Sequence, residues 1–445
     1  MANRLAVIGG DAGGMSAATQ ARRLDPSLEI VAFEKTEWTS YSACGIPYLV
    51  SGEIGTLEQL VARSPQEHRD QSHIDVRIHH EVMGVDLPGG RLEVRDHVRG
   101  RTIQVPFDML LLGMGARPIR PDLPGIDLPI VHGVQTLHDA AQLLRYAERS
   151  RCSDVVVVGG GYIGLELAEA FIEREARVMV VERDPHVMST LDGDMAALIE
   201  ESMRKLGIEL RLNTEIIGFD EDAVVTRDGR ISADLVIVGI GVEPNSELAR
   251  DAGIELGVRR SVRVDRRQRT SAPNVWAAGD CVESFHLVSH RPVYVALGTI
   301  ANRHGRVAGI NIGGGYAAFP GIVGTAVTRI CATEVGRTGL NEREARDAGF
   351  EFVTAIVDST TTASYFQHAQ KITVKLLAER RSGRIIGAQI VGGRGAGKRI
   401  DVAAAAITAG MDAGQLVDLD FGYAPPVSPL WDPIASTARV ILSDL

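Results

Sequence analysis

The sequence predicts an α/β protein in which two parallel-sheet nucleotide-binding units precede a smaller C-terminal unit of mixed α+β structure. Two stretches, 4–35 and 154–183, follow one plan: a short aliphatic run, a glycine-rich turn, an alanine-rich helical pattern and a β-branched run that ends near a glutamate. Apolar runs of this length are typical of buried parallel strands, and a helix joining two of them makes a βαβ unit. After residue 321, alternating segments indicate antiparallel strands with short helices.

Composition excludes several other classes of protein. The 445 residues are 45% hydrophobic and 23% charged, as in ordinary globular proteins. A net charge of −10 gives no overall attraction to nucleic acid or anionic lipid, and no apolar run reaches the roughly 18 residues of a membrane-spanning helix. Four widely spaced cysteines without a CxxC pair argue against a disulfide scaffold or a zinc site. We therefore expect a cytoplasmic protein with no metal, no nucleic-acid partner and no membrane contact.

The second glycine turn carries a complete GxGxxG pattern in Gly159, Gly161 and Gly164. Between a strand and a helix, these glycines permit a tight turn, let a pyrophosphate approach the backbone and pack the helix on the strand. Glu182 ends the next strand, where it would accept both hydroxyls of an adenosine ribose. The turn therefore predicts a Rossmann-like site for NADH. A carboxylate there disfavours a 2′-phosphate, but the neighbouring Arg183 leaves NADPH possible.

The first glycine turn is similar but has an acid in the middle. Gly9 and Gly14 hold the outer positions, and Asp11 replaces the middle glycine, where it would crowd a pyrophosphate unless the loop is rearranged. Glu34 still ends the following strand. A later strand-like segment ends in Asp280, which could bind a second polyol such as the ribityl chain of a flavin.

Cys44 follows the first βαβ unit in the stretch TSYSACGIPYLVSG. Ser42 could cap a short helix that tolerates Pro47 in its first turn, which would place Cys44 near a helix N-terminus. A thiolate is stabilised there, so the sequence predicts a lowered pKa and a reactive thiol, against the alternative of a buried, inert cysteine. Leu49 stands where a CxxxxC dithiol would need its second cysteine. Any redox role therefore uses one thiol, through sulfenic acid or a mixed disulfide.

These motifs together resemble those of the FAD-dependent pyridine nucleotide-disulfide oxidoreductases over essentially the whole chain. The resemblance is carried by the first glycine turn with Glu34, by SACGIPY around Cys44 and by VGGGYIGLE with Glu182. Further matching stretches are LLLGMGARP, VGIGVEPN, TSAPNVWAAGD, TGL and YAPPVSP. The resemblance implies an FAD domain at 1–112 and 244–320, an NAD(P)H domain at 113–243 and a C-terminal dimerisation domain at 321–445, and hence a homodimer.

The resemblance also implies FAD and NADH as cofactors, with NADPH possible. In the family, a tyrosine in the position of Tyr162 swings aside to admit the nicotinamide, and Glu166 lies close by. The implied cofactor-binding residues belong to the two glycine loops and the segments that face them: Gly9, Asp11, Ala12, Gly14, Glu34, Lys35, Ala116, Gly159, Gly161, Tyr162, Ile163, Gly164, Glu166, Glu182, Gly241, Gly279 and Asp280.

The single cysteine is typical of the branch that contains coenzyme A disulfide reductases, NADH oxidases, NADH peroxidases and polysulfide or persulfide reductases. Peroxidases and water-forming oxidases carry a histidine where this chain has Ala12, so peroxide reduction would lack its proton donor. The coenzyme A disulfide reductases have alanine there and rely on two tyrosines, which Tyr365 and Tyr423 match, the second contributed by the partner subunit. Interface packing is the alternative for both tyrosines.

The resemblance extends less completely to a coenzyme A site. Two positions depart from the reductases, since Ala43 replaces an asparagine and Ser72 a lysine, for which Arg63 or Arg69 could substitute. The implied reaction carries electrons from NAD(P)H through FAD to Cys44 and on to a low-molecular-weight disulfide, with coenzyme A disulfide as the first expectation. An NADH oxidase, a persulfide or polysulfide reductase and a non-catalytic redox flavoprotein stay open. The matching substrate positions are Gln20, Arg23, Ser40 and Tyr41.

Overall fold

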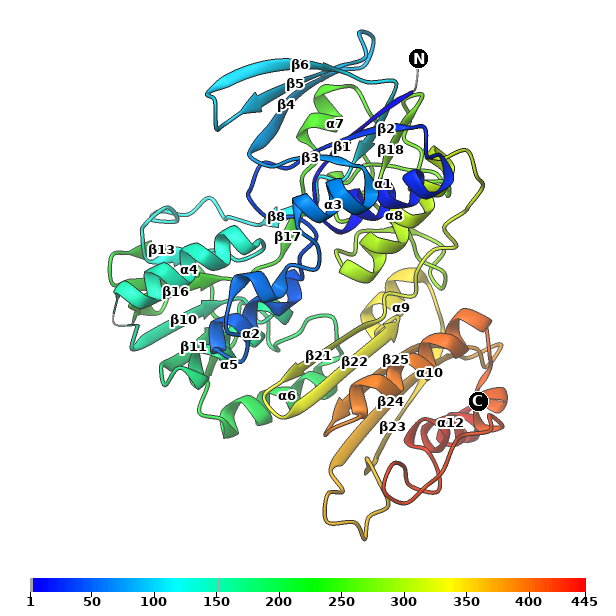
Figure 1. The fold of residues 1–445 in the computed structure, drawn as a ribbon. Coiled ribbons are helices and arrows are strands. Elements are labelled where there is room, and N and C mark those ends of the chain that lie inside the picture. The colour runs from blue at the N-terminus through cyan, green and yellow to red at the C-terminus, as the bar shows by residue number, and fades with distance from the viewer. Residues whose placement is uncertain (1–2, 151) are drawn as a thin grey trace.

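Three five-stranded sheets organise the computed structural model, which describes residues 3–150 and 152–445 (Figure 1). Two of these sheets are parallel and carry helices, and the third is antiparallel. In Figure 1 the first parallel unit lies at the top, the second at the left and the antiparallel C-terminal unit at the lower right. The predicted fold class, two Rossmann-like units followed by an α+β unit, is confirmed.

The first parallel sheet has the strand order β18-β7-β1-β2-β3. Its aliphatic side chains are buried against helices α1 and α8. These helices pack closely because a Cβ on Gly305 or Gly309 of α8 would come within 2.4 Å of backbone oxygens of α1. The elements are β1 (Arg4–Ile8), α1 (Ala12–Leu24), β2 (Glu29–Phe33), β3 (Asp75–Arg77), β7 (Met109–Leu112), β18 (Val275–Ala277) and α8 (Gly298–Ile312).

The second parallel sheet repeats the first. Its order is β12-β11-β10-β16-β9, so β10, β11, β12 and β16 stand in for β1, β2, β3 and β7. An antiparallel three-stranded sheet is inserted at the same point of each unit. In the first unit β4-β5-β6 precedes β7, and in the second β13-β14-β15 precedes β16. The elements are β4 (His80–Asp86), β5 (Arg91–Asp96), β6 (Arg101–Pro106), β9 (Val131–His132), α4 (Leu137–Arg149), β10 (Asp154–Val158), α5 (Tyr162–Glu173), β11 (Arg177–Val181), α6 (Gly193–Lys205), β12 (Glu209–Arg211), β13 (Ile216–Asp220), β14 (Ala223–Thr226), β15 (Gly229–Ser232) and β16 (Leu235–Val238).

Two adjacent segments connect the parallel units. Strands β8 (Ala116–Pro118) and β17 (Val242–Pro244) pair in an antiparallel ribbon. The guanidinium of Arg117 fastens this ribbon, at 2.9 Å from Glu243 and 2.6 Å from Glu247. The ribbon lies where the sequence predicted the chain to leave and re-enter the first unit, although the domain boundaries themselves stay a prediction.

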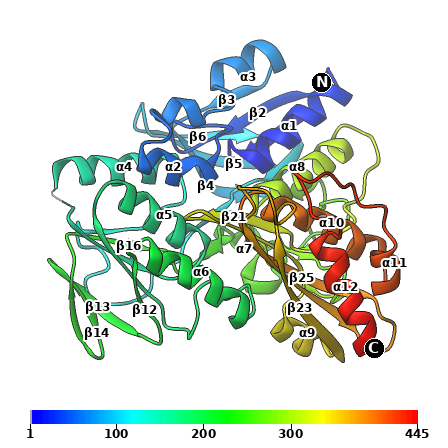
Figure 2. The same cartoon turned by 90° about the horizontal axis from the view of Figure 1, so that it is seen from below.

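The C-terminal sheet has the order β21-β22-β25-β24-β23 and is antiparallel throughout. In Figure 2 it stands between α6 of the second unit and the helices α10 and α12. The helix predicted at 401–411 begins earlier, at Ala396, and α12 was not predicted. The elements are β21 (Ala326–Ile330), β22 (Thr333–Gly339), α9 (Glu342–Ala348), β23 (Phe352–Thr360), β24 (Lys371–Glu379), β25 (Ile385–Gly392), α10 (Ala396–Ala409), α11 (Ala413–Val417) and α12 (Pro433–Asp444).

Candidate active site

The two glycine loops have nearly the same backbone. Gly9 has a φ of +105° and Gly159 a φ of +104°, a region that side chains rarely adopt. A Cβ on Gly14 would lie 2.0 Å from the oxygen of Gly9, and one on Gly164 would lie 2.3 Å from that of Gly159. Each loop therefore brings its helix against its strand, as the spacing predicted.

The acid at the end of the second strand holds the glycine loop in each unit. The carboxylate of Glu34 accepts the N–H of Gly10 at 3.0 Å, and that of Glu182 accepts the N–H of Gly160 at 2.6 Å. Their other oxygens accept backbone N–H groups two residues further along. Both carboxylates thus lie beside a helix N-terminus, where an adenosine ribose would sit.

Asp11 occupies the middle position of the first loop without rearranging it. Its φ is −117°, compared with −81° for Gly161, and it precedes α1 without capping it. Its carboxylate turns to the segment that leads to Cys44, where Oδ1 accepts the N–H of Tyr41 at 3.1 Å. Burial, with Glu34 and Asp280 nearby, raises the pKa of Asp11 to about 7. Because the Asp11 carboxylate points toward Tyr41, the glycine loop keeps its conformation with an acid at its middle position.

Asp280 is a half-buried carboxylate at the edge of the first unit's predicted cofactor site. It follows Gly279, whose φ is +88°, and burial raises its pKa to about 6. Within the described residues no group donates a hydrogen bond to this carboxylate. The hydroxyl of Tyr294, whose pKa the Asp280 carboxylate helps to raise, is also buried and unpaired. A polyol or a flavin edge would satisfy both groups, and nothing in the local sequence around Tyr294 signalled this role.

Cys44 lies near a helix N-terminus, as predicted, but the predicted cap and the lowered pKa are wrong. It sits in a short 3-10 turn, Ala43–Gly45, that leads directly into α2 (Ile46–Ser51), and Ser42 makes no capping hydrogen bond. Its pKa is raised, first by partial burial and then by the carboxylates of Glu166 and Asp280. Because α2 packs against α5, and the residues before Cys44 are hydrogen-bonded to the first glycine loop, the thiol lies between the two predicted cofactor sites.

Tyr162 and Glu166 lie one turn apart on α5, on the side of Cys44. The Tyr162 phenol is buried and accepts a hydrogen bond from the Thr190 hydroxyl at 3.3 Å. Burial raises the pKa of Glu166, which accepts a hydrogen bond from the Thr328 hydroxyl. Neither threonine was found from the sequence. A narrow cleft leads from Glu166 to the surface between α2, α5 and β21, lined by Pro47, Tyr48, Ser51, Glu53, Glu166, Glu169, Ala170, Glu173 and Arg329.

Two of the predicted substrate positions are anchored to the first glycine loop. Ser40, with a φ of +47°, donates its N–H to the oxygen of Gly10, and its hydroxyl lies 2.9 Å from Nε2 of His68. The next residue, Tyr41, donates its N–H to the carboxylate of Asp11. Burial lowers the pKa of His68 to about 4, so it stays neutral near pH 7.

Arg63 and Arg69, the two candidates for the missing lysine's place, make different contacts. Arg63 donates Nη1 to the hydroxyl of Ser72 at 3.3 Å, whereas Arg69 is turned to the carbonyl of Val76 at 2.6 Å. Gln20 is half-buried and Arg23 is exposed in the last turns of α1. That end of α1 lies beside the end of α3 (Pro65–Ser72), because Arg22 bonds the carbonyl of His73.

The structure brings Tyr365 and Tyr423 to each other rather than to Cys44 of the same chain. The segments that carry the two exposed tyrosines lie side by side, because the N–H of Ala363 donates to the oxygen of Pro425 at 3.0 Å. The segment that links β23 to β24 and carries Tyr365 lies at the bottom of Figure 1, far from α2. Their assignment to the active site, and the subunit that supplies each of them, stay predictions.

The remaining predicted cofactor positions lie around the two loops. Ala12 and Ile163 are in the first turns of α1 and α5, and Lys35 is exposed beside Glu34. Ala116 begins β8, and Gly241, with a φ of +107°, precedes β17. These two positions place the connecting ribbon beside the predicted cofactor sites.

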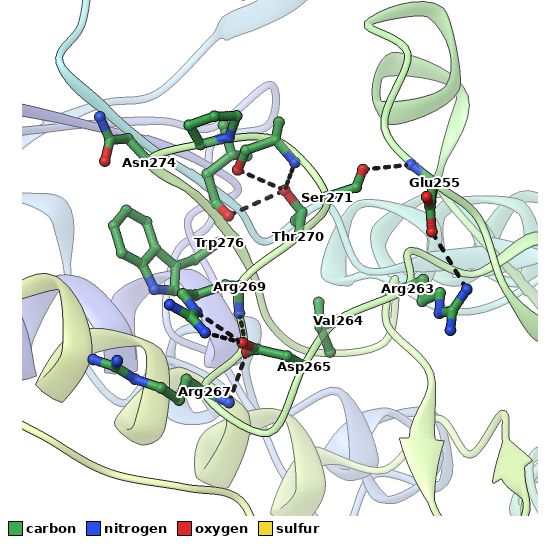
Figure 3. A pocket seen from close by; sticks show the side chains of 13 residues that line it. Glu255, Arg263, Val264, Asp265, Arg267, Arg269, Thr270, Ser271, Asn274 and Trp276 are labelled. Carbon is green, nitrogen blue, oxygen red and sulfur yellow. Dashed lines mark hydrogen bonds and ion pairs between the residues drawn. The ribbon is translucent and has the colours of Figure 1, made fainter.

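A separate hollow lies on the first unit (Figure 3). It surrounds the N-terminal end of β18. Because β18, β7 and β1 are parallel, this end of the sheet lies opposite the glycine loop, which follows the C-terminal end of β1. Two of its arginines are already paired, Arg263 with Glu255 at 3.3 Å and Arg269 with Asp265 at 2.6 Å. The hollow is therefore not part of the candidate active site.

The described ranges, 3–150 and 152–445, contain no cluster of three or more His, Cys, Asp or Glu side chains suited to a metal ion. No helix in this part of the chain has the length and apolar character needed to cross a membrane.

Two dinucleotide-binding units facing one cysteine define a class of protein, the oxidoreductases that use a flavin and a nicotinamide nucleotide. A family model described as pyridine nucleotide-disulphide oxidoreductase matches residues 3–304, and the model of that family's dimerisation domain matches residues 325–433. The chain belongs to this family. It is an FAD-dependent NAD(P)H oxidoreductase.

Individual relatives cover nearly the whole chain. An "NAD(P)H sulfur oxidoreductase (CoA-dependent)" of Pyrococcus furiosus is 37% identical over 98% of this chain and 99% of its own. An "NAD(P)H coenzyme A polysulfide/persulfide reductase" of Pyrococcus horikoshii is 36% identical over 99% of each. A "Coenzyme A disulfide reductase" of Staphylococcus epidermidis is 28% identical over 96% and 97%. A solved NAD-dependent persulfide reductase from A. fulgidus has a TM-score of 0.96 and 35% identity, covering 99% of this chain and 83% of its own.

Proposed function

We propose that the chain reduces sulfur–sulfur bonds carried by coenzyme A, either coenzyme A disulfide or a coenzyme A persulfide, through the single thiol of Cys44. The observation that carries the proposal is the position of Cys44 between the first glycine loop, to which Ser40 and Tyr41 are hydrogen-bonded, and α5, against which α2 packs. Cys281 offers no second redox thiol, because it is fully buried and its pKa is raised to about 12. All four cysteines are free, which supports a cytoplasmic location.

The residues of the first unit fit FAD. The glycine loop presents N–H groups at the start of α1, Glu34 suits a ribose, and the orphaned Asp280 and Tyr294 need polar partners. The second unit fits NAD(P)H in the same way through Gly161 and Glu182. When bound, the flavin supplies the transfer of two electrons from NAD(P)H to sulfur.

The reaction at sulfur then depends on one group of the chain, the thiolate of Cys44. Cys44 attacks one sulfur of R–S–S–R′ and forms a mixed disulfide with it, and the other sulfur leaves as a thiolate that takes up a proton. Two electrons from NAD(P)H break the mixed disulfide, which releases the second thiol and restores the Cys44 thiolate. One NAD(P)H and one proton are consumed and two thiols form, or one thiol and hydrogen sulfide from a persulfide.

The proton for the leaving sulfur is assigned to the tyrosine pair of a partner subunit. Tyr365 and Tyr423 belong to adjacent segments of one chain, joined by the hydrogen bond from the N–H of Ala363 to the oxygen of Pro425. Both are exposed, in a C-terminal region that also exposes Val427, Leu430 and Trp431. An apolar face of this kind supports the homodimer that the dimerisation-domain match indicates.

Coenzyme A recognition is supported by the surface beside Ser40. Arg63, with its guanidinium at Ser72, and Arg23, exposed at the end of α1, are the cations available for its phosphates. Because Arg63 lies next to Ser40 in the paired segments around Tyr41 and Val61, it is the better substitute for the missing lysine than Arg69.

The test is anaerobic consumption of NADH with coenzyme A disulfide, coenzyme A persulfide or glutathione disulfide as sole acceptor. We expect turnover with both coenzyme A acceptors and at least about tenfold slower turnover with glutathione disulfide, which lacks phosphates for the arginines. No turnover with either coenzyme A acceptor, together with rapid NADH consumption in air, would overturn the proposal in favour of an oxidase.

A separate prediction concerns the choice of nicotinamide nucleotide, for which we propose NADH. The Arg183 side chain is 81% exposed, and it lies 3.7 Å from the carboxylate of Asp184. Glu182 should repel a 2′-phosphate, whereas Arg183 is free to attract it. We expect a lower KM for NADH than for NADPH. Arg183→Ala should raise the KM for NADPH about fivefold, as for an exposed ion pair, and leave that for NADH within about twofold.

The matched variant is Glu182→Gln, which keeps an acceptor for the N–H of Gly160 but removes the charge. It should lower the KM for NADPH and leave the flavin content unchanged. A wild-type enzyme with the lower KM for NADPH would contradict the assignment to NADH.

A further inference from the structure

A buried polar row crosses the C-terminal sheet and faces the second nucleotide-binding unit. Arg337 on β22, Gln389 on β25 and Lys375 on β24 are direct cross-strand neighbours, so their side chains share one face. Their relative exposures are 8%, 1% and 1%. Burying two cations is costly unless each is paired, and the proposed chemistry uses neither of them.

The partners of this row lie in one loop, residues 184–192, between β11 and α6. Nη1 of Arg337 donates to the backbone oxygen of Thr190 at 3.1 Å, and Nδ2 of Asn341 donates to the same oxygen at 3.2 Å. Gln389 exchanges two hydrogen bonds with Asp192, at 2.8 and 2.7 Å. Lys375 lies 3.0 Å from Asp192. The C-terminal unit thus clamps this loop along its second half.

The charges of the row are balanced locally. Glu344 lies 2.8 Å from Arg337, and Asp194 and Glu342 each lie 2.7 Å from Lys375. The same guanidinium also donates to the oxygen of Gly339. With every charge compensated, the row forms a rigid, directional contact rather than a strained one.

The opposite side of the same loop contacts the nucleotide-binding loop. Met188, with a φ of +49°, donates its N–H to the oxygen of Gly160 at 2.7 Å. The hydroxyl of Thr190 donates to the phenol oxygen of Tyr162 at 3.3 Å. One residue, Thr190, therefore touches the C-terminal unit with its backbone and Tyr162 with its side chain.

We propose that the C-terminal unit sets the resting position of Tyr162: Arg337 and Asn341 fix the backbone of Thr190, and the Thr190 hydroxyl latches the phenol. The inference rests on the proposed function and on the family resemblance, which implies that the nicotinamide displaces Tyr162. Thr190 and Arg337 are positioning residues, because they act through Tyr162. Binding of the nucleotide must therefore break the hydrogen bond between Thr190 and Tyr162, which weakens its affinity.

The direct test is Thr190→Val in the FAD-loaded enzyme, with the Kd for NAD⁺ measured by calorimetry. Loss of one neutral hydrogen bond should free the phenol and lower the Kd roughly 2- to 10-fold. The matched control is Thr338→Val, which removes a similar hydroxyl contact, 2.8 Å from Thr325, one residue beyond Arg337. It should leave the Kd unchanged. A Kd in Thr190→Val that equals the wild-type value would overturn the latch.

The role of the C-terminal unit is tested by Arg337→Lys, which keeps the buried charge but loses the guanidinium's several donors. It should lower the Kd for NAD⁺ in the wild-type background and have no further effect in Thr190→Val. A shift of equal size in both backgrounds would show that Arg337 acts by another route and would overturn its part of the proposal. If this variant does not fold, Asn341→Ala is measured in the same two backgrounds.

Tyr162→Ala separates failure of the latch from failure of the proposed function. We expect it to lower the Kd for NAD⁺ at least as much as Thr190→Val does. If it does, and Thr190→Val does not, only the latch is wrong. A Kd unaffected by Tyr162→Ala would mean that this tyrosine does not cover the nicotinamide site, which would overturn both.

Discussion

Replacing Cys44 by serine is expected to lower NAD(P)H-dependent reduction of coenzyme A disulfide or persulfide by roughly 10³-fold or more, as loss of a covalent nucleophile does. A serine hydroxyl has nearly the same size but cannot form the mixed disulfide on which each turnover depends. Binding of FAD should be unaffected, because the groups proposed to hold it, Glu34 and Asp280, are untouched. The measurement is anaerobic steady-state turnover beside the flavin content of the purified protein.

The matched control is Cys331→Ser. Cys331 lies at the turn between β21 and β22, where its N–H donates to Glu169, and its pKa is raised to about 12. This variant should keep wild-type turnover. Anaerobic bleaching of the flavin by NADH should persist in Cys44→Ser, which locates the defect at the sulfur step. Substantial turnover with Cys44→Ser would remove the thiol from the mechanism.

The two nucleotide-binding units were predictable because their signals are local. A strand, a glycine turn, a helix and a terminal acid lie within about thirty residues, the usual extent of a βαβ unit, and each glycine has a geometric cause in the structure. The C-terminal strands were predictable from their alternation. Helix α12 was missed because the chain before it is rich in proline, although Asp432 and Pro433 form an ordinary helix start in which Asp432 accepts the N–H of Ile434.

The parts of the site that were missed depend on contacts between distant segments. The sequence predicted a lowered pKa for Cys44 from a local helix start, but its pKa is set by burial and by Glu166 and Asp280, which come from two other elements. Asp11 was expected to crowd the loop, and its solution is a hydrogen bond to Tyr41. No spacing rule could find Thr190, whose role depends on a sheet formed much later in the chain.

Alanine at the third glycine of each loop should produce reciprocal losses of cofactor. In Gly164→Ala the new Cβ would lie 2.3 Å from the oxygen of Gly159, so α5 must move away from β10. We expect NAD(P)H to bind about 10- to 100-fold more weakly, as for an overpacking strain of this kind, while FAD is retained. In Gly14→Ala the corresponding distance is 2.0 Å, and the FAD content should fall while NAD⁺ still binds. Flavin absorbance and calorimetry with NAD⁺ check the two arms.

The middle position of the second loop separates strain from ligand contact. A Cβ on Gly161 would meet only the oxygen of Gly239, at an ordinary 3.7 Å, and the φ of −81° suits alanine. Gly161→Ala should therefore keep the wild-type Tm yet weaken NAD(P)H, because the methyl group would occupy the space that the pyrophosphate needs. Gly164→Ala should lower both Tm and affinity. If Gly161→Ala binds NAD(P)H normally, the pyrophosphate does not approach this glycine, and the assignment of the second loop to the nicotinamide nucleotide fails. If Gly164→Ala loses FAD and keeps NAD⁺, the two loops have been assigned to the wrong cofactors.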